Sequence, residues 1–199
     1  MNLPNKISLT RICMIPVFVL VFFLDGILPF NYGIAAIIFA VAAFTDFLDG
    51  HIARSRGLVT NLGKFLDPIA DKVLVATAMI LLLTMKNTLF AVYEGVENTL
   101  YIITAISICV LLARELIISA FRQIAAANGI VMAAEKLGKY KTVCQDVSIF
   151  VLILAADITG TAGTVVAWVG FALFMAATVL TVWSGITYVV KNKQVLKDN

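Results

Sequence analysis

The sequence has little charge, one histidine and few cysteines, and these shortages exclude several kinds of protein. Only 14% of the 199 residues are charged and 61% are hydrophobic, whereas soluble domains have about 25% charged and about 45–50% apolar residues. A lone histidine, His51, cannot by itself form a histidine-based metal site. The three cysteines, Cys13, Cys109 and Cys144, lack metal-ligand spacing and cannot all pair, so we interpret them as reduced packing residues. The formal net charge of +3 gives no indication of nucleic-acid binding.

Long apolar segments dominate the chain, and they predict an all-α integral membrane protein. A helix needs roughly 20 mostly apolar residues to cross a bilayer. Lys6 and Arg11 come before an apolar run as in a signal peptide, but no small-residue cleavage site follows it, so we expect a retained helix. We therefore predict a single membrane domain over residues 1–199 with six transmembrane helices. The six segments are residues 7–24, 33–54, 65–85, 100–121, 141–156 and 165–190.

The basic residues predict how these helices are oriented. With six spans, fourteen of the fifteen Lys and Arg residues fall on one side, and only Lys86 falls on the other. Lys and Arg concentrate on the cytoplasmic side of membrane proteins. We therefore expect both termini in the cytoplasm. The alternation also supports the number of spans, because a missed helix would scatter these charges over both sides.

One stretch, "DFLDGHIARSRGLVTNLGKFLDPIADK", breaks the apolar pattern. The first two of its aspartates are three residues apart and the last two are four apart, so each pair lies on one face of its helix. Gly50 and Gly63 share these faces and allow close approach of a ligand. Only a short turn joins the two helices, so they are antiparallel neighbours whose acidic faces converge. The four aspartates are Asp46, Asp49, Asp67 and Asp71.

Four converging carboxylates need positive charge, and their oxygen ligands favour hard divalent ions such as Mg²⁺, Mn²⁺ or Ca²⁺. Two metals are compatible with four carboxylates, and two-metal sites support displacement at phosphorus. Arg54, one turn beyond Gly50, is placed to contact a phosphate. A purely structural role is disfavoured by the periodic spacing. A proton or cation relay of a transporter is the competing hypothesis.

The stretch resembles the signature of the CDP-alcohol phosphotransferases at every signature position. The resemblance implies six transmembrane helices, usually a homodimer, with an active site open to the cytoplasm. It implies that Asp46, Asp49 and Asp67 are the principal metal ligands, with Mg²⁺ or Mn²⁺ bound. Asp71 would be the general base and share in metal binding. The implied CDP-binding residues are Gly50, Ala53, Arg54 and Gly63.

The alcohol acceptor must be recognised elsewhere. Arg114 lies in an apolar segment next to Glu115, which makes either an ion pair or an anion site possible. Further basic residues follow on the same side, and together with Arg114 they suggest a phosphorylated acceptor. Taken singly, each of these would be explained by contact with lipid headgroups. They are Arg122, Lys136, Lys139 and Lys141.

Three further segments, "NLPNKISLTRI", "ARELIISAFR" and "KLGKYKTVCQ", resemble the bacterial phosphatidylglycerophosphate synthases within that family. This implies transfer from CDP-diacylglycerol to sn-glycerol 3-phosphate, in the plasma membrane, giving phosphatidylglycerol phosphate and CMP. Asn5 and Thr10 would then lie near the cytidine or its phosphates, with a helix cap and an interfacial hydroxyl as the alternatives. Alternative acceptors are phosphatidylglycerol, as in cardiolipin synthases, inositol phosphate and serine.

Overall fold

The computed structural model describes residues 3–55, 61–127 and 136–193, and in these ranges the chain is helical with no strand. Each of the six predicted segments corresponds to one long helix, so the prediction of six helices in an all-α chain is confirmed. The predicted bounds differ most around residues 121–141, where two helices extend further than their apolar segments. The elements are α1 (Leu3–Phe22), α2 (Asn31–Ser55), α3 (Asn61–Thr84), η1 (Phe90–Val92), α4 (Glu97–Ala127), α5 (Lys136–Ala155) and α6 (Gly160–Lys191).

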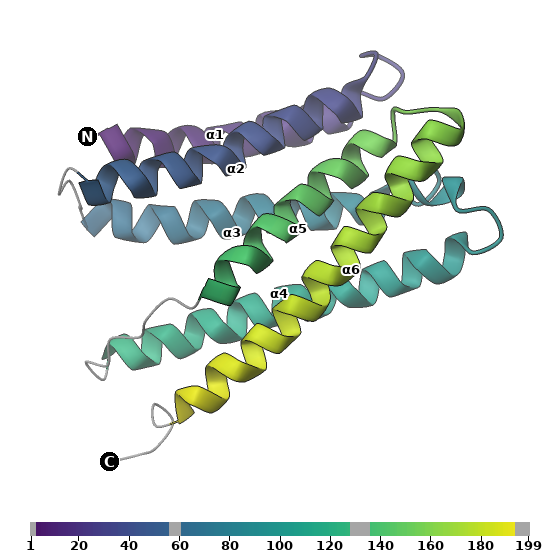
Figure 1. Ribbon diagram of the computed structural model, residues 1–199. Helices are drawn as coiled ribbons and strands as arrows, with labels where there is room; N and C mark the ends of the chain where they lie inside the picture. The colour runs from purple at the N-terminus through teal and green to yellow at the C-terminus, as the bar shows by residue number, and fades with distance from the viewer. Residues whose placement is uncertain (1–2, 56–60, 128–135, 194–199) are drawn as a thin grey trace.

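The helices form one bundle whose two chain ends lie at the same end (Figure 1). Helices α1, α2 and α3 lie side by side, and α5 and α6 run together across them, with α5 packed on α2 and α3. Helix α4 lies beside α6 and contacts α3. Because each helix reverses the direction of the one before, α2 ends and α3 begins at the end that carries the termini. This places the two halves of the aspartate stretch together.

Aromatic side chains fill the core between α1 and α2. The Phe18 side chain is fully buried, and its ring centroid lies 5.9 Å from that of Phe39. Phe22 and Tyr32 meet edge to face at 5.2 Å. Such tilted and edge-to-face pairs add about 0.5–1.5 kcal/mol beyond the burial of their area. They fix α1 against the helix that carries Asp46 and Asp49.

Polar contacts close the bundle at the end opposite the termini. The Asp157 carboxylate, between α5 and α6, accepts a hydrogen bond of 2.6 Å from the Gly33 amide in the first turn of α2. Asn31 donates to the Phe22 carbonyl at 2.9 Å, which satisfies a group at the end of α1. At Gly163 an added Cβ would lie 1.8 Å from the Ile158 carbonyl oxygen, so α6 can begin in this way only with glycine there.

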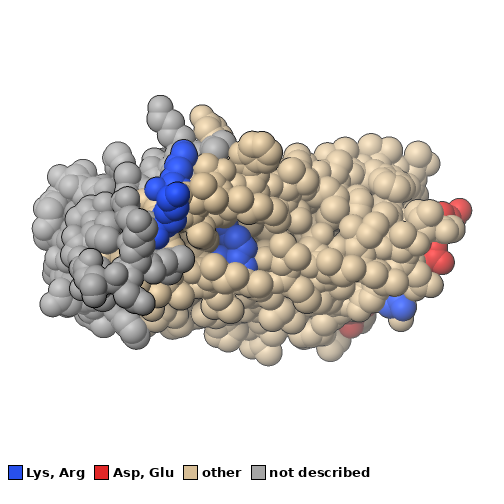
Figure 2. Space-filling model, turned by 90° about the horizontal axis from the view of Figure 1, so that it is seen from below, with Lys and Arg blue, Asp and Glu red and all other residues tan. Residues whose placement is uncertain are grey.

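The outer surface is apolar over most of its length. Large hydrophobic side chains are exposed on all the long helices, including Leu20, Leu116 and Trp183, each at least two-thirds exposed. Figure 2 shows a broad tan surface with basic side chains toward its middle, while the acidic side chains lie toward the right-hand end together with a further basic one. Among the described residues, two helices, α4 and α6, are long and apolar enough to cross a membrane.

The cysteines match the sequence-based interpretation only in part. Cys13, Cys109 and Cys144 are all free thiols, as predicted. However, Cys13 and Cys109 lie on exposed faces, so the interpretation of these two as packing residues is wrong. The outer surface of the bundle is itself apolar, so an apolar sequence around a cysteine does not imply that the cysteine is buried.

Candidate active site

The aspartate signature lies where α2 and α3 meet at the end of the bundle that holds the chain termini. Asp46 and Asp49 are in the last three turns of α2, and Asp67 and Asp71 are in the first three turns of α3. The two helices contact one another and run in opposite directions. The side chains at most signature positions are not among those that the structure describes. That these side chains come close together therefore stays a prediction. These positions are Asp46, Asp49, Gly50, Ala53, Arg54, Gly63 and Asp67.

Asp71 is the signature aspartate whose surroundings the structure describes. It is half-buried. Its neighbour Lys72 donates a hydrogen bond to the Ser119 hydroxyl of α4, and α3 also contacts α5. The predicted general base therefore lies on the part of α3 that meets α4.

A charged cluster joins α4 to α5 at this point. Arg114 Nη1 donates to Glu115 Oε1 at 3.0 Å, and Lys141 Nζ donates to the same oxygen. The Lys141 side chain is only 6% exposed, against 17% for Arg114. The ion pair that was one alternative for Arg114 is thus present in the structure. Lys141 forms a second ion pair with the same glutamate. One acceptor oxygen holds a buried lysine and a partly buried arginine close together.

Helix α6 contacts both arginines of α4. Arg114 Nη2 donates to the Ser184 hydroxyl at 3.0 Å, and Arg122 Nε donates to the Tyr188 hydroxyl at 3.1 Å. These α6 contacts were not predicted, because a serine and a tyrosine in an apolar helix give no separate signal. The predicted cations Lys136 and Lys139 lie on α5 with side chains outside the described set.

Arg11 of α1 is a second feature that the sequence did not single out. Its side chain is fully buried, and Nε donates to the Ala42 carbonyl and the Thr45 hydroxyl of α2, each at 3.2 Å. Thr45 directly precedes Asp46, so Arg11 anchors α1 to the carboxylate-bearing part of α2. The signal was an arginine within an apolar segment, which is costly in a membrane and usually functional.

The two softer predictions for the CDP site fall on α1. Thr10 is exposed, and its hydroxyl donates to the Lys6 carbonyl of its own helix at 2.9 Å. This hydrogen bond stays within the helix and gives no evidence for or against a nucleotide. Asn5 lies in the first turn of α1, with its side chain outside the described residues. The placement of both residues near the cytidine stays a prediction.

The chemistry of the donor set fits a hard divalent metal, because the signature offers only carboxylate oxygens. Among the residues whose side chains are described, no group of three or more Asp, Glu, His or Cys residues comes together. Three of the four predicted ligands, Asp46, Asp49 and Asp67, lie outside that set. Asp71 is the described member.

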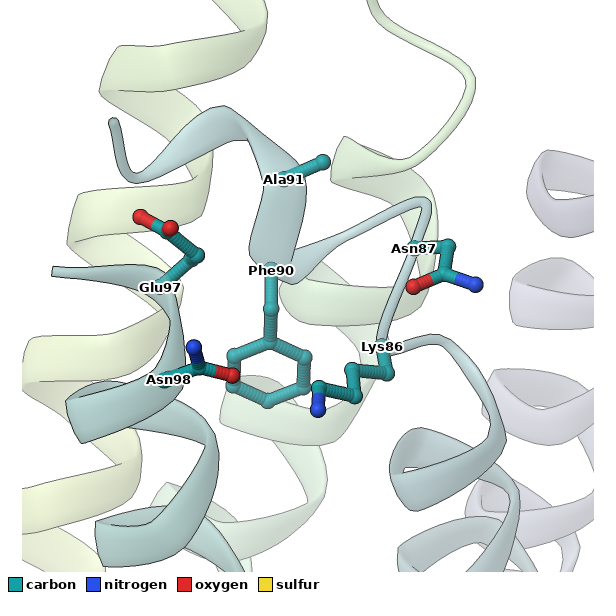
Figure 3. A pocket seen from close by; sticks show the side chains of 6 residues that line it. All are labelled: Lys86, Asn87, Phe90, Ala91, Glu97 and Asn98. Carbon is teal, nitrogen blue, oxygen red and sulfur yellow. The ribbon is translucent and has the colours of Figure 1, made fainter. Parts of the chain in front are cut away.

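A separate hollow of about 250 Å³ lies at the opposite end of the bundle, between η1 and the start of α4. Phe90 projects into it, and Lys86 and Asn98 approach the ring of Phe90 from different sides (Figure 3). It is remote from the signature and takes no part in the site described above. Its full lining is Lys86, Asn87, Phe90, Ala91, Glu97 and Asn98.

Comparison with known protein families identifies the class to which this helical bundle belongs. Residues 1–183 match the model of the CDP-alcohol phosphatidyltransferase family. The chain belongs to this family.

Named relatives are similar over nearly the whole chain. A protein of Shigella flexneri serotype 5b is 38% identical over 99% of this chain and 98% of its own length. A protein of Escherichia coli (strain K12) is 37% identical over the same shares. One of Bacillus subtilis (strain 168) is 37% identical over 77% of both chains. All three are named CDP-diacylglycerol--glycerol-3-phosphate 3-phosphatidyltransferase.

Proposed function

We propose that this chain transfers the phosphatidyl group of CDP-diacylglycerol to sn-glycerol 3-phosphate, giving phosphatidylglycerol phosphate and CMP. The observation that carries the proposal is the near full-length similarity to transferases named for this reaction. The site is compatible with it, since the buried Lys141 and the partly buried Arg114 come together at Glu115, where α4 meets α5. The transporter hypothesis loses its support, because the family to which the chain belongs consists of transferases.

In the proposed reaction the hydroxyl oxygen of the acceptor attacks the phosphorus that carries the diacylglycerol. The bond from that phosphorus to the bridging oxygen breaks, and CMP leaves with the bond's electrons. Asp71 accepts the hydroxyl proton, as a positioned carboxylate does in general base catalysis. Gly50 and Gly63 leave room for the donor, while Ala53 and Arg54 complete its site on α2.

Metal binding is part of the proposal. Asp46, Asp49, Asp67 and Asp71 would hold Mg²⁺ or Mn²⁺, with two ions as the expected number. The family is generally dependent on divalent metals. When bound, such ions neutralise the diphosphate of the donor and stabilise the leaving CMP.

The acceptor's phosphate would bind to the cations of α4 and α5. Arg114 and Lys141 are held close together by Glu115, and a phosphate can be shared between two cations. Arg122 adds positive charge about two turns after Arg114 on α4. Lys136 and Lys139 add further positive charge on α5. Lys72, next to Asp71, contacts Ser119, which lies one turn after Glu115 on α4, and this supports a geometry in which the acceptor's hydroxyl reaches the base.

We further propose that all six helices span the plasma membrane, with the termini and the active site on the cytoplasmic side. The exposed apolar surface and the asymmetry of basic residues support this arrangement. The acyl chains of the donor would then remain in the bilayer while its head group reaches the site. A homodimer is expected from the resemblance to the family.

Release of CMP from a panel of acceptors tests the proposal. Purified protein in detergent receives CDP-diacylglycerol, Mn²⁺ or Mg²⁺, and one of glycerol 3-phosphate, phosphatidylglycerol, inositol phosphate or serine. We expect CMP with glycerol 3-phosphate and little with the others. CMP with another acceptor alone would overturn the choice of acceptor, whereas no CMP with any would overturn the transferase activity.

A further inference from the structure

Helix α6 presents three polar or small residues to the arginines of α4, although most of its surface is apolar. Ser184 and Gly185 lie beside Arg114, and Tyr188, one turn later, lies beside Arg122. All three residues of α6 are buried. Nothing in the reaction proposed above uses them, so their close fit to two cations calls for a separate explanation.

The fit around Arg114 is tight on two sides. Its Nη2 donates to the Ser184 hydroxyl at 3.0 Å, and Ser184 in turn donates to the Thr181 carbonyl at 3.1 Å. An added Cβ on Gly185 would come within 3.1 Å of Arg114 Cγ and 3.2 Å of Nε. The arginine side chain therefore crosses α6 through the space that a glycine leaves. Glu115 holds Nη1, so the guanidinium has one defined orientation.

The fit around Arg122 combines a hydrogen bond with an aromatic contact. Nε donates to the Tyr188 hydroxyl at 3.1 Å, and the guanidinium carbon lies 5.3 Å from the centre of the Tyr188 ring. The ring is itself fixed, because it is 4% exposed and packs at 6.2 Å against Phe121. A rigid phenol thus holds a long, flexible side chain that is otherwise exposed.

We propose that α6 positions the arginines for the acceptor's phosphate, with Ser184 and Tyr188 as the positioning residues and Gly185 as the residue that gives Arg114 room. A long cation pays rotamer entropy when it binds an anion, and a prior hydrogen bond reduces that loss. The inference rests on the proposed function for the identity of the anion, a phosphate monoester. It adds that the site requires α6 as well as α4 and α5.

Four variants test the proposal in the full-length protein. Ser184→Ala and Tyr188→Phe each remove a hydroxyl that accepts from an arginine, while Ser184→Thr retains a hydroxyl. Thr181→Val is the matched control, because the buried Thr181 hydroxyl donates to the Ala177 carbonyl of its own helix at 2.6 Å and not to an arginine among the described residues. For each variant, kcat, the KM of glycerol 3-phosphate, the KM of CDP-diacylglycerol and the melting temperature are measured.

We expect Ser184→Ala and Tyr188→Phe to raise the acceptor KM about tenfold, in line with the loss of a hydrogen bond to a charged group. The donor KM should stay within about twofold, and Ser184→Thr and Thr181→Val should resemble wild type. An unchanged acceptor KM, or equal rises for donor and acceptor, would overturn the inference. So would a Thr181→Val variant that behaves like Ser184→Ala.

A binding measurement separates this inference from the proposed reaction. Inorganic phosphate should raise the melting temperature of wild type and Thr181→Val, and the rise should be lost in Ser184→Ala. If wild type releases no CMP but this pattern holds, the reaction is wrong and the positioning role stands. If wild type is active and phosphate stabilises Ser184→Ala equally well, the positioning role is wrong.

Discussion

Glu115 is the anion on which the charged cluster between α4 and α5 depends, and Glu115→Gln tests this dependence. Its Oε1 accepts from both Arg114 and Lys141, whose side chains are 17% and 6% exposed. The glutamine has nearly the same shape but no charge. It leaves two cations facing each other without the carboxylate between them.

The expected loss of stability follows from this burial. Removing one partner of a fully buried ion pair costs about 3–5 kcal/mol. Glu115 is 26% exposed, so water screens part of the remaining charge. We therefore expect about 2 kcal/mol, which lowers the melting temperature of a chain of this size by about 4–8 °C. The double variant Glu115→Gln with Lys141→Met also removes Lys141, the more buried of the two cations bound to Glu115. It should recover at least half of the lost stability.

The assay is thermal unfolding of the purified protein in detergent, followed by circular dichroism. Wild type, the two single variants and the double variant form a complete cycle from which the coupling between Glu115 and Lys141 is obtained. A melting temperature of Glu115→Gln within about 1 °C of wild type would contradict the account of the cluster. A double variant less stable than Glu115→Gln would contradict the claim that the stranded Lys141 causes the loss.

Three further predictions concern the base, the metal and the start of α6. Asp71→Asn should lower kcat by about 10²–10⁴-fold, because general base catalysis contributes that much, with the KM of CDP-diacylglycerol little changed; a variant at wild-type rate refutes the base. Chelation with EDTA should abolish CMP release, and added Mn²⁺ or Mg²⁺ should restore it; activity that persists in EDTA refutes the metal requirement. Gly163→Ala should destabilise the fold by about 1–3 kcal/mol through its clash with the Ile158 carbonyl. Gly138→Ala on α5, where an added Cβ meets nothing within 4 Å, should be neutral or stabilising, and equal losses in both would contradict this explanation.

The helices were predictable because each contains a long apolar segment, and such segments are visible in the sequence. The bounds were less predictable where helices extend beyond the apolar region. Helix α4 continues through the polar residues after Phe121 to Ala127, and α5 begins at Lys136. Backbone hydrogen bonding continues a helix past its apolar segment, so hydropathy alone ends α4 too early and begins α5 too late.

Candidate site residues can be recognised in the sequence where charge stands out against an apolar background. The aspartates and Arg114 did so, and the pairing of Arg114 with Glu115 was one of two alternatives derived from their adjacency. The contribution of α6 was not predictable, since Ser184 and Tyr188 resemble any polar residues of a packed helix. Which of the six helices meet in space is decided by packing over long sequence separations, and no local pattern records it.

The most direct test of the account is the stoichiometry and identity of the products. Purified protein is incubated with CDP-diacylglycerol, glycerol 3-phosphate and Mn²⁺, and CMP and the lipid product are quantified by mass spectrometry. The account predicts equal amounts of CMP and phosphatidylglycerol phosphate, and almost no CMP when glycerol 3-phosphate is omitted. CMP released at the same rate without acceptor, together with phosphatidic acid, would mean hydrolysis and would contradict the central claim of transfer.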